Sequence, residues 1–386
     1  MKIGIDGNEA NVERKVGISE YAFELLLQFS NSKFKTPSNT AGRQNSKFLI
    51  YLKDKPRNEL PKPDNNWEYR VLKPGKLWTQ CRLPLDLYLH QPRPSVFFSP
   101  THYSPRFSPV PTVISVMDLS YLYFPEMFNI TDLYKLRNWT AYSVKRAKRV
   151  LTISSSTKFD IIREYKIPEE KVIAIYPGVK INMNFSPHVK DMNFLKYKYE
   201  ISDNFILFVG TLQPRKNIVR LIEAFAKVLE SNNTPEDIQL VIVGKKGWLY
   251  EEILKKPKEL GIEDRAKFLD FVSDEELALF YKHAICFVLP SLYEGFGLPV
   301  LEAMKYNCPV ITSNVSSLPE AGGDAALYVD PKDVNDIAEK ILDIVTHPEL
   351  RKKLKEKSKI QVEKFSWEKT ARETLRVLEE VGSLSS

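Results

Sequence analysis

The chain has 386 residues, of which 43% are hydrophobic and 27% are charged, and its formal net charge at pH 7 is +7. This composition is ordinary for globular proteins and excludes a largely disordered chain, while the length predicts two domains. No stretch reaches the roughly 18 consecutive apolar residues of a membrane-spanning helix, and the N-terminal sequence has the pattern of neither a signal peptide nor a transit peptide, so we expect a cytoplasmic protein.

Short apolar runs alternate with longer amphipathic segments in the first half of the chain. The apolar runs predict buried strands, and the amphipathic segments predict helices. The predicted strands are 2–6, 48–52, 96–99, 112–116 and 150–153, and the predicted helices are 18–29, 131–147 and 156–165. Two segments rich in Pro, Asn, Ser and Gly, 36–45 and 56–66, predict long surface loops.

The same alternation begins again at Phe205. The second series predicts strands 205–209, 239–243, 267–269, 285–289 and 309–312, with helices at 218–230, 249–260, 274–283, from 298 and at 334–346. Alternating strands and helices imply parallel sheets with helices on both faces. Two such series predict an α/β protein built from two doubly wound, Rossmann-like domains.

The domain boundary is expected after Pro177-Gly178, where a polar, Asn-rich stretch interrupted by Pro187 is typical of a linker or hinge. We therefore predict an N-terminal domain over 1–178, a linker over 179–204 and a C-terminal domain over 205–365. Residues 366–386 predict a terminal helix, for which Ser366 is the candidate N-cap.

The densest cluster of positive charge that we identify is Lys145, Arg146, Lys148 and Arg149, at the end of the helix expected over 131–147. Cations are favourable at a helix C-terminus, and a surface for anionic lipid or another polyanion is the alternative interpretation. Nucleic acid is not expected as a partner, because the chain has no RNP motif, zinc-finger spacing or basic stripe with interleaved aromatic residues.

In doubly wound domains, ligands bind beyond the carboxyl ends of the strands, near helix N-termini. The turn after strand 205–209 reads Gly210-Thr-Leu-Gln-Pro-Arg215-Lys216-Asn217. It places two adjacent cations at a helix start, where the helix dipole disfavours them. Such a pair suits a bound diphosphate, because Arg offers a planar fork of donors and Lys a point charge. Two solvated surface cations are the alternative.

The turn after strand 285–289 leads into Glu294-Gly-Phe-Gly-Leu-Pro-Val-Leu-Glu302. Its glycines allow backbone amides to approach a ligand closely, and Pro299 suits the first turn of a helix. Glu294 is therefore expected in the loop and Glu302 in the helix. Apolar neighbours indicate that Glu302 is partly buried, where it needs hydrogen-bond donors such as ribose hydroxyls; an exposed helical acid is the alternative.

Weaker candidates lie at other strand ends. They are Gly244 after strand 239–243, Gly17 before helix 18–29 and Asp118 after strand 112–116, although Asp118 could equally be an N-cap. His102 is the only histidine in such a loop, and no Asp-x-Asp pair or His/Cys cluster at metal-ligand spacing occurs. We therefore expect no metal ion and no cofactor.

With these turns, the sequence resembles the retaining glycosyltransferases of the two-domain GT-B fold, family 4 type, whose two Rossmann-like domains face each other across a cleft. Glu294 and Glu302 match the Glu-x7-Glu motif of that family, and Val209 through Asn217 looks like its diphosphate-binding segment. Segments 310–327 and 151–155 are also similar. The resemblance covers most of the second domain and the first more loosely. Many relatives carry His-Asp where this chain has Met117-Asp118.

The resemblance implies a role for each candidate residue. Arg215 and Lys216 would hold the nucleotide diphosphate, Glu302 would bind the ribose, and Glu294 would contact a hydroxyl of the transferred sugar. The implied catalytic residues are Glu294, Arg215, Lys216 and Asp118. The implied substrate-binding residues are Gly17, Gly210, Gly244, Phe271, Val272, Phe296, Gly297, Leu298 and Glu302. The terminal helix would cross back to the first domain.

The implied activity is retaining, metal-independent transfer of a hexose from a nucleotide-diphosphate sugar to a glycan or a lipid-linked acceptor. Mannose from GDP-mannose is favoured over UDP-sugars, because the chain is similar overall to mannosyltransferase members. A peripheral contact with the inner face of the membrane is expected from the basic cluster and from an exposed aromatic loop at 121–124. The alternatives are a GT-B epimerase or phosphorylase and a two-domain binding protein without catalysis.

Overall fold

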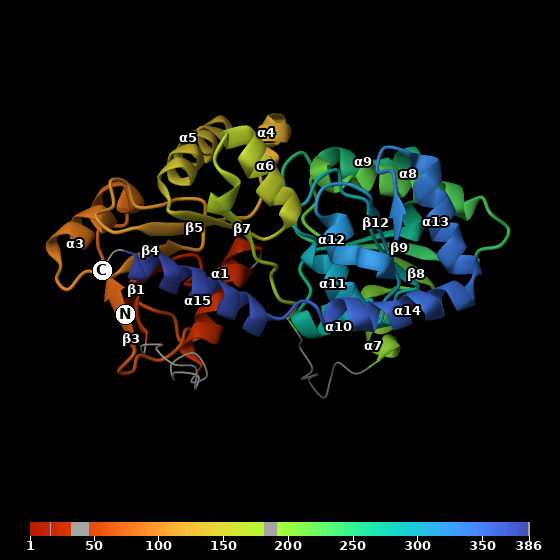
Figure 1. Ribbon diagram of the computed structural model, residues 1–386. Coiled ribbons are helices and arrows are strands. Elements are labelled where there is room, and N and C mark those ends of the chain that lie inside the picture. Colours follow the sequence, from red (N-terminus) through yellow and green to blue (C-terminus); the bar gives the residue numbers. More distant parts are fainter. Residues whose placement is uncertain (16, 32–45, 181–190, 385–386) are drawn as a thin grey trace. The chain divides into compact units, whose positions relative to one another are not determined.

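The computed structural model describes residues 1–15, 17–31, 46–180 and 191–384 (Figure 1). These residues form two compact units, each with its own sheet. The first unit contains 1–123, 129–178 and 365–386, and the second contains 179–364 together with 124–128. The predicted loop 36–45 and residues 181–190 of the predicted linker lie outside the described residues.

The first unit is built on a seven-stranded sheet in the order β3-β2-β1-β4-β5-β6-β7, and every pair of neighbouring strands is parallel. The strands are β1 (Lys2–Asp6), β2 (Lys47–Leu52), β3 (Trp67–Val71), β4 (Val96–Ser99), β5 (Thr112–Val116), β6 (Arg149–Thr152) and β7 (Val172–Ala174). Strands β4 and β5 are buried along their whole length, as expected for continuous apolar runs covered on both faces. The strand order reverses between β1 and β4, so the loops after these strands diverge at one edge.

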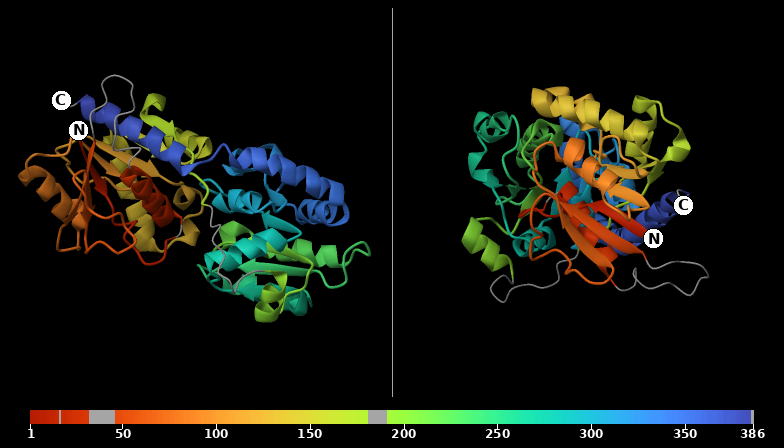
Figure 2. Two further views of the ribbon diagram at one scale, coloured as in Figure 1. Left: turned by 90° about the horizontal axis from the view of Figure 1, so that it is seen from below. Right: turned by 90° about the vertical axis from the view of Figure 1, so that its left-hand side faces the viewer.

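Helices cover both faces of this sheet (Figures 1 and 2). They are α1 (Ile18–Ser30), α3 (Leu83–Leu89), α4 (Ser120–Tyr123), α5 (Ile130–Arg146), α6 (Ser155–Tyr165) and α15 (Trp367–Ser383), with the short turns η1 (Trp78–Arg82) and η3 (Glu169–Lys171). Helix α15 starts at the predicted cap, because the Ser366 side chain accepts a hydrogen bond from the Lys369 amide. It packs beside α1, and its Trp367 and Leu378 join the core over β1 and β2.

The second unit has a six-stranded parallel sheet in the order β10-β9-β8-β11-β12-β13. Its strands are β8 (Phe205–Val209), β9 (Gln239–Val243), β10 (Ala266–Leu269), β11 (Cys286–Leu289), β12 (Val310–Ser313) and β13 (Ala326–Val329). Here the order reverses between β8 and β11. The predicted diphosphate-binding turn after β8 and the turn with Glu294 after β11 therefore follow neighbouring strands, although about 75 residues separate them along the chain.

The helices of the second unit are α7 (Met192–Tyr199), α8 (Ile218–Leu229), α9 (Glu251–Glu259), α10 (Asp274–His283), α11 (Leu298–Lys305), α12 (Leu318–Gly322), α13 (Val334–Thr346) and α14 (Pro348–Val362). Shorter turns are η2 (Pro125–Met127), η4 (Pro214–Lys216), η5 (Glu263–Arg265) and η6 (Gly323–Ala325). None of the helices in the described parts of the chain is long and apolar enough to cross a membrane.

Two doubly wound parallel sheets confirm the predicted fold class. The prediction that 179–204 is a linker is wrong for its second half, because α7 lies there and packs against α10 in the second unit. Asp191 caps this helix by accepting from the Phe194 amide, and Leu195 is its buried anchor. The helix is rich in Lys and Tyr, and with a single buried residue it shows too little apolar periodicity to be recognised from sequence.

Candidate functional site

The turn after β8 is held against the turn after β11. Asn217 adopts a left-handed backbone with φ 59° at the start of α8, and its side-chain amide donates to the Pro290 carbonyl at 2.9 Å and to the Pro331 carbonyl at 2.6 Å. The Leu292 amide donates to the Arg215 carbonyl at 2.9 Å. These bonds fix the short η4 turn, and with it the two predicted diphosphate ligands, at the sheet edge.

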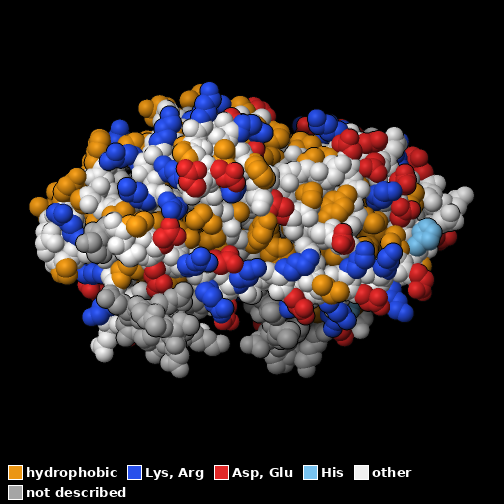
Figure 3. Space-filling model, viewed as in Figure 1, with side chains coloured by type: hydrophobic (Ala, Val, Ile, Leu, Met, Phe, Trp, Pro, Cys, Tyr) orange, Lys and Arg blue, Asp and Glu red, His pale blue; other side chains and the backbone are white. Residues whose placement is uncertain are grey.

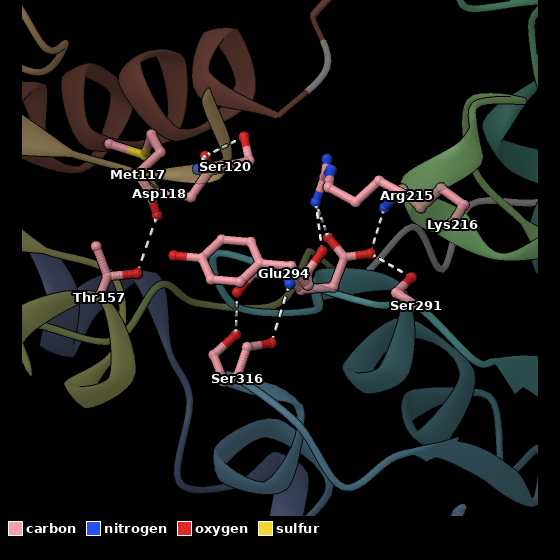
Figure 4. A network of polar contacts seen from close by, with 11 residues as sticks. Met117, Asp118, Ser120, Thr157, Arg215, Lys216, Ser291, Glu294 and Ser316 are labelled. Atoms are coloured by element: carbon pink, nitrogen blue, oxygen red, sulfur yellow. Dashed lines mark hydrogen bonds and ion pairs between the residues drawn. The ribbon is translucent and has the colours of Figure 1, made fainter. Parts of the chain in front are cut away.

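Arg215 and Lys216 both point toward the carboxylate of Glu294 (Figure 4). Lys216 Nζ lies 2.5 Å from Glu294 Oε1, and Arg215 Nη1 lies 3.2 Å from Oε2. Ser291 Oγ donates to Oε1 at 2.7 Å. Only 7% of Glu294 and 9% of Lys216 is exposed. The structure therefore brings together three of the predicted catalytic residues in one buried ion cluster.

The charge of the Glu294 carboxylate is fixed over the physiological pH range. Burial alone would raise the pKa of Glu294, but the charges of Lys216 and Arg215, with the hydrogen bonds from Lys216 and Ser291, lower it to about 2. Glu294 is therefore ionised and offsets one of the two cations. The cluster keeps a net positive charge and is suited to an anionic ligand.

The backbone around Glu294 is held by two serines of the β12 turn. The Glu294 amide donates to Ser316 Oγ at 3.0 Å, and Ser317 Oγ donates to the Glu294 carbonyl at 2.8 Å. Ser316 and Ser317 are not among the site residues predicted from the sequence. The available signal was their position, because these adjacent hydroxyl residues lie in the turn after the buried strand β12, whose neighbour is β11.

Glu302 lies in α11, whose N-cap residue is Gly297 with φ +101°. A Cβ at Gly297 would lie 2.8 Å from a methyl carbon of Leu318, so this turn requires glycine. Glu302 is half-buried, in agreement with the sequence interpretation, and accepts a hydrogen bond of 3.0 Å from the Tyr281 hydroxyl. Burial and the nearby Glu302 charge raise the pKa of Tyr281, so its hydroxyl keeps the proton that it donates. Tyr281 was not predicted as a site residue, because in the sequence it resembles an ordinary core aromatic residue of α10.

The remaining predicted ligands of this unit lie on neighbouring strand ends. Gly210 follows β8 and Gly244 follows β9, and a Cβ at Gly244 would lie 1.9 Å from the Gly210 carbonyl oxygen. Phe271 and Val272 follow β10, where Phe271 is 65% exposed and Val272 is buried. Phe296 is also buried and Leu298 is half-buried at the start of α11. The adjacent ends of β10, β9, β8 and β11 thus carry most of the candidate site.

Asp118 and Gly17 belong to the first unit. Asp118 Oδ1 accepts from the Ser120 amide at 2.8 Å and from Ser120 Oγ at 2.6 Å, so it is bonded to the first residue of the short helix α4 (Ser120–Tyr123). The residue directly before this helix is Leu119, so Asp118 lies one position before the N-cap. Gly17 has φ +56° at the start of α1, with open space where a Cβ would be.

The structure also places a histidine beside Met117. His102, in the loop after β4, accepts a hydrogen bond of 3.3 Å at Nε2 from the Met117 amide. Burial lowers the pKa of His102, and the Asp118 charge acts against this effect. The chain has no histidine at position 117, but the neighbouring strand supplies one to the same sheet edge. Strand order, which the local sequence does not reveal, is what joins the two residues.

The predicted membrane surface needs two corrections. Tyr121 is buried, with its hydroxyl 2.6 Å from that of Tyr165, so it is not part of an exposed aromatic loop. Arg149 forms an ion pair of 2.7 Å with Glu380, which leaves Lys145, Arg146 and Lys148 as the exposed cations of the cluster. A larger group of cations lies on α14, which has six Lys or Arg residues and two Glu (Figure 3). Its net charge is +4 of the chain's +7.

Two family models match the chain. The model described as "Glycosyl transferases group 1" matches residues 191–361, and the model described as "Glycosyltransferase Family 4" matches residues 52–182. The first match contains every predicted site residue of the second unit.

Curated relatives and a solved structure agree with these matches. The O-antigen chain mannosyltransferase B of Escherichia coli is 32% identical over 309 residues, which are 80% of this chain and 78% of that protein. The O-antigen chain mannosyltransferase RfbU of Salmonella typhimurium is 33% identical over 220 residues, 57% of each chain. The sucrose-phosphate synthase of Thermosynechococcus elongatus superposes over the full length of both chains with a TM-score of 0.76 and 17% identity, a likeness of fold.

Proposed function

Since the chain belongs to the glycosyl transferases group 1 family and transfers a hexose from a nucleotide-diphosphate sugar, we propose that the sugar is mannose and the donor GDP-mannose. The E. coli and Salmonella relatives are named as mannosyltransferases, which supports the choice of sugar. We propose a glycan or a lipid-linked saccharide as the acceptor, because both relatives are named as O-antigen chain enzymes.

The observation that carries the proposed chemistry is the cation pair beside the β8–β11 switch point. As the bond between the sugar and the phosphate breaks, negative charge develops on the leaving nucleoside diphosphate. Arg215 and Lys216 are fixed donors at the start of α8, and loss of one such donor costs about 3–4 kcal/mol of transition-state stabilisation in comparable oxyanion sites. These cations supply the charge that a metal ion would otherwise provide, so we propose a metal-independent reaction.

The ionisation of Glu294 supports retention of configuration. A carboxylate whose pKa is about 2, bound to two cations, is a poor base. We therefore propose that the acceptor oxygen attacks the sugar carbon on the face from which the phosphate departs. The acceptor proton then passes to the departing phosphate oxygen. Glu294 binds a sugar hydroxyl and Glu302 binds the ribose.

A panel of nucleotide sugars, with release of free nucleotide as the readout, tests this function. GDP-mannose should be cleaved in the presence of acceptor, and EDTA should leave the rate unchanged. An epimerase would convert one nucleotide sugar into another without releasing nucleotide, and a binding protein would do neither. Lys216→Gln should slow release by about a hundredfold or more. Lys227→Gln, which alters an exposed lysine of the same helix α8, is the matched control.

Titration with GDP and with UDP tests the choice of base. We expect GDP to bind more tightly, and tighter binding of UDP would contradict the proposed donor. Activity that disappears with EDTA and returns with Mg²⁺ or Mn²⁺ would contradict metal independence.

We also propose that the exposed face of α5 contacts the cytoplasmic face of the membrane along the length of the helix. The exposed cations Lys145, Arg146 and Lys148 lie at or just beyond the end of this helix, and Ile130 and Tyr134 at its start are 86% and 63% exposed. Each Lys or Arg near an anionic bilayer contributes about 1 kcal/mol of binding free energy. Together these side chains support a peripheral contact with anionic lipid.

Co-sedimentation with vesicles that contain anionic lipid tests this contact. The triple variant Lys145→Gln, Arg146→Gln, Lys148→Gln should lose most of its binding. Replacement of three α14 lysines (Lys352, Lys353 and Lys355) by Gln removes the same net charge and is the matched control. If both triple variants bind equally well, or if the α5 variant binds like the wild type, the assignment to α5 is wrong.

A further inference from the structure

We propose that Glu294 is the resident counter-ion of Arg215 and Lys216, that the diphosphate competes with it for the donors of both cations on binding, and that its charge helps to expel the nucleoside diphosphate product. This inference rests on the proposed function, because it assigns the diphosphate to these two cations. In addition to its contact with the sugar, Glu294 would then set the affinity of the site for the nucleotide.

The contacts of the ligand-free cluster support this role. Lys216 Nζ and Arg215 Nη1 donate to different oxygens of the same carboxylate, at 2.5 and 3.2 Å. Both cations have side chains that are less than 15% exposed, so each needs an anionic or polar partner when the nucleotide is absent. The phosphate oxygens of a bound nucleotide would compete for these same N–H donors. The carboxylate and the diphosphate therefore share two cations.

The carboxylate cannot move far when the nucleotide binds. The Glu294 backbone is held on both sides of its Cα, by the bond from its amide to Ser316 and by the bond from Ser317 to its carbonyl. Ser291 Oγ adds a third bond, directly to the carboxylate. A negative charge therefore remains close to the diphosphate in a poorly solvated place, where like charges repel strongly.

This repulsion is larger for the product than for the donor. The terminal phosphate of a free nucleoside diphosphate loses a second proton near neutral pH, so the product carries one more negative charge than the donor diphosphate. A fixed carboxylate therefore weakens product binding more than donor binding. When the product leaves, Glu294 is again the anion that both buried cations share.

Calorimetric titration of Glu294→Gln with GDP and UDP tests the inference, because neither ligand has a transferred sugar. The amide keeps the shape of the side chain and removes its charge. We expect the preferred nucleotide to bind about tenfold more tightly, equivalent to about 1.4 kcal/mol, and to dissociate more slowly in stopped-flow measurements. Glu276→Gln is the matched control, since Glu276 is also buried and ion-paired to a lysine, Lys198, in the same unit. Its nucleotide affinity should equal that of the wild type.

A second pair of variants covers the case in which Glu294→Gln does not fold. The double variant Lys216→Gln, Glu294→Gln has the net charge of the wild-type cluster and should bind the nucleotide about tenfold more tightly than Lys216→Gln alone. Equal or weaker binding in the folded Glu294→Gln variant, or in the double variant relative to Lys216→Gln, overturns the inference while the proposed function stands. A wild-type protein that binds neither GDP nor UDP overturns both.

Discussion

Replacement of Gly244 by alanine tests how closely the strand ends at the site are fitted together. A Cβ at this position would lie 1.9 Å from the carbonyl oxygen of Gly210 and 2.7 Å from its carbon, whereas real Cβ contacts essentially never fall below 3.0 Å. Gly244 also has φ +155°, which L side chains rarely adopt. The clash is with backbone, so no side-chain rotation relieves it.

The cost follows from the bonds that join these strand ends. The Gly210 amide donates to the Val243 carbonyl at 2.9 Å, and the Gly244 amide donates to the Leu269 carbonyl at 2.9 Å. The Cβ–oxygen contact must lengthen by at least 1.1 Å, which stretches one of these bonds beyond hydrogen-bond range. The lost bond costs about 1 kcal/mol, and the overpacking adds about 2 kcal/mol. We therefore expect Gly244→Ala to lower the free energy of unfolding by about 3 kcal/mol.

Activity should fall as well, because the displaced segment leads directly to Arg215 and Lys216. A shift of about 1 Å in positioning groups can reduce a rate by about a hundredfold. Urea denaturation followed by circular dichroism measures the loss of stability, and nucleotide release from the donor measures the rate. Gly261→Ala is the control, since Gly261 has φ +67° but no atom within 4 Å of the added Cβ; it should cost about 1 kcal/mol of backbone strain and leave the rate unchanged. If Gly244→Ala is as stable and as active as Gly261→Ala, the steric argument is wrong.

Two further predictions concern carboxylates. Glu302→Gln should weaken nucleoside diphosphate binding about tenfold to a hundredfold in calorimetry, because hydrogen bonds to a charged group contribute about 1.5–3 kcal/mol. Tyr281→Phe removes the hydroxyl that donates to Glu302 and should weaken binding in the same direction but by less. Unchanged affinity in Glu302→Gln would refute the ribose contact. Burial, partly offset by hydrogen bonds from Asn8, raises the pKa of Asp6 from 3.8 to about 6. Between these pH values the folded chain binds a proton that the unfolded chain releases, so this group lowers stability as the pH rises through the window. The rise in pKa corresponds to about 3 kcal/mol at neutral pH, and Asp6→Asn should remove it; a stability difference between variant and wild type that does not grow from pH 4 to pH 7 in urea denaturation would contradict this expectation.

The order of strands and helices was predictable because it depends on local chemistry. Buried parallel strands are short continuous apolar runs, and the helices between them have apolar residues at helical spacing. The strands 2–6, 96–99, 112–116, 205–209 and 239–243 were predicted with the bounds that the structure gives them. Elements with weaker patterns were missed, among them β3, β7, β13, α3, α7, α12 and α14. Helix α14, for example, alternates lysines with few apolar residues, and its buried face is narrow.

The candidate ligands were predictable for a related reason. In a doubly wound domain the turns after strands reach the ligand edge, so the glycines, cations and carboxylates of two such turns could be selected from the sequence. What those side chains do to one another could not. From the sequence, Arg215 and Lys216 were predicted to bind the diphosphate and Glu294 to bind the sugar, as separate contacts.

Only the tertiary structure joins Glu294 to Arg215 and Lys216, which are 79 and 78 positions away in the chain. Parallel neighbours are connected by long crossovers, and β8 and β11 become neighbours only because the strand order reverses between them. The same reason explains why the Tyr281–Glu302 contact, the serine contacts to the Glu294 backbone and the position of His102 were invisible in the sequence. Local periodicity determines which segments are strands, whereas packing of the whole sheet determines which strand ends meet and therefore which charges share a site.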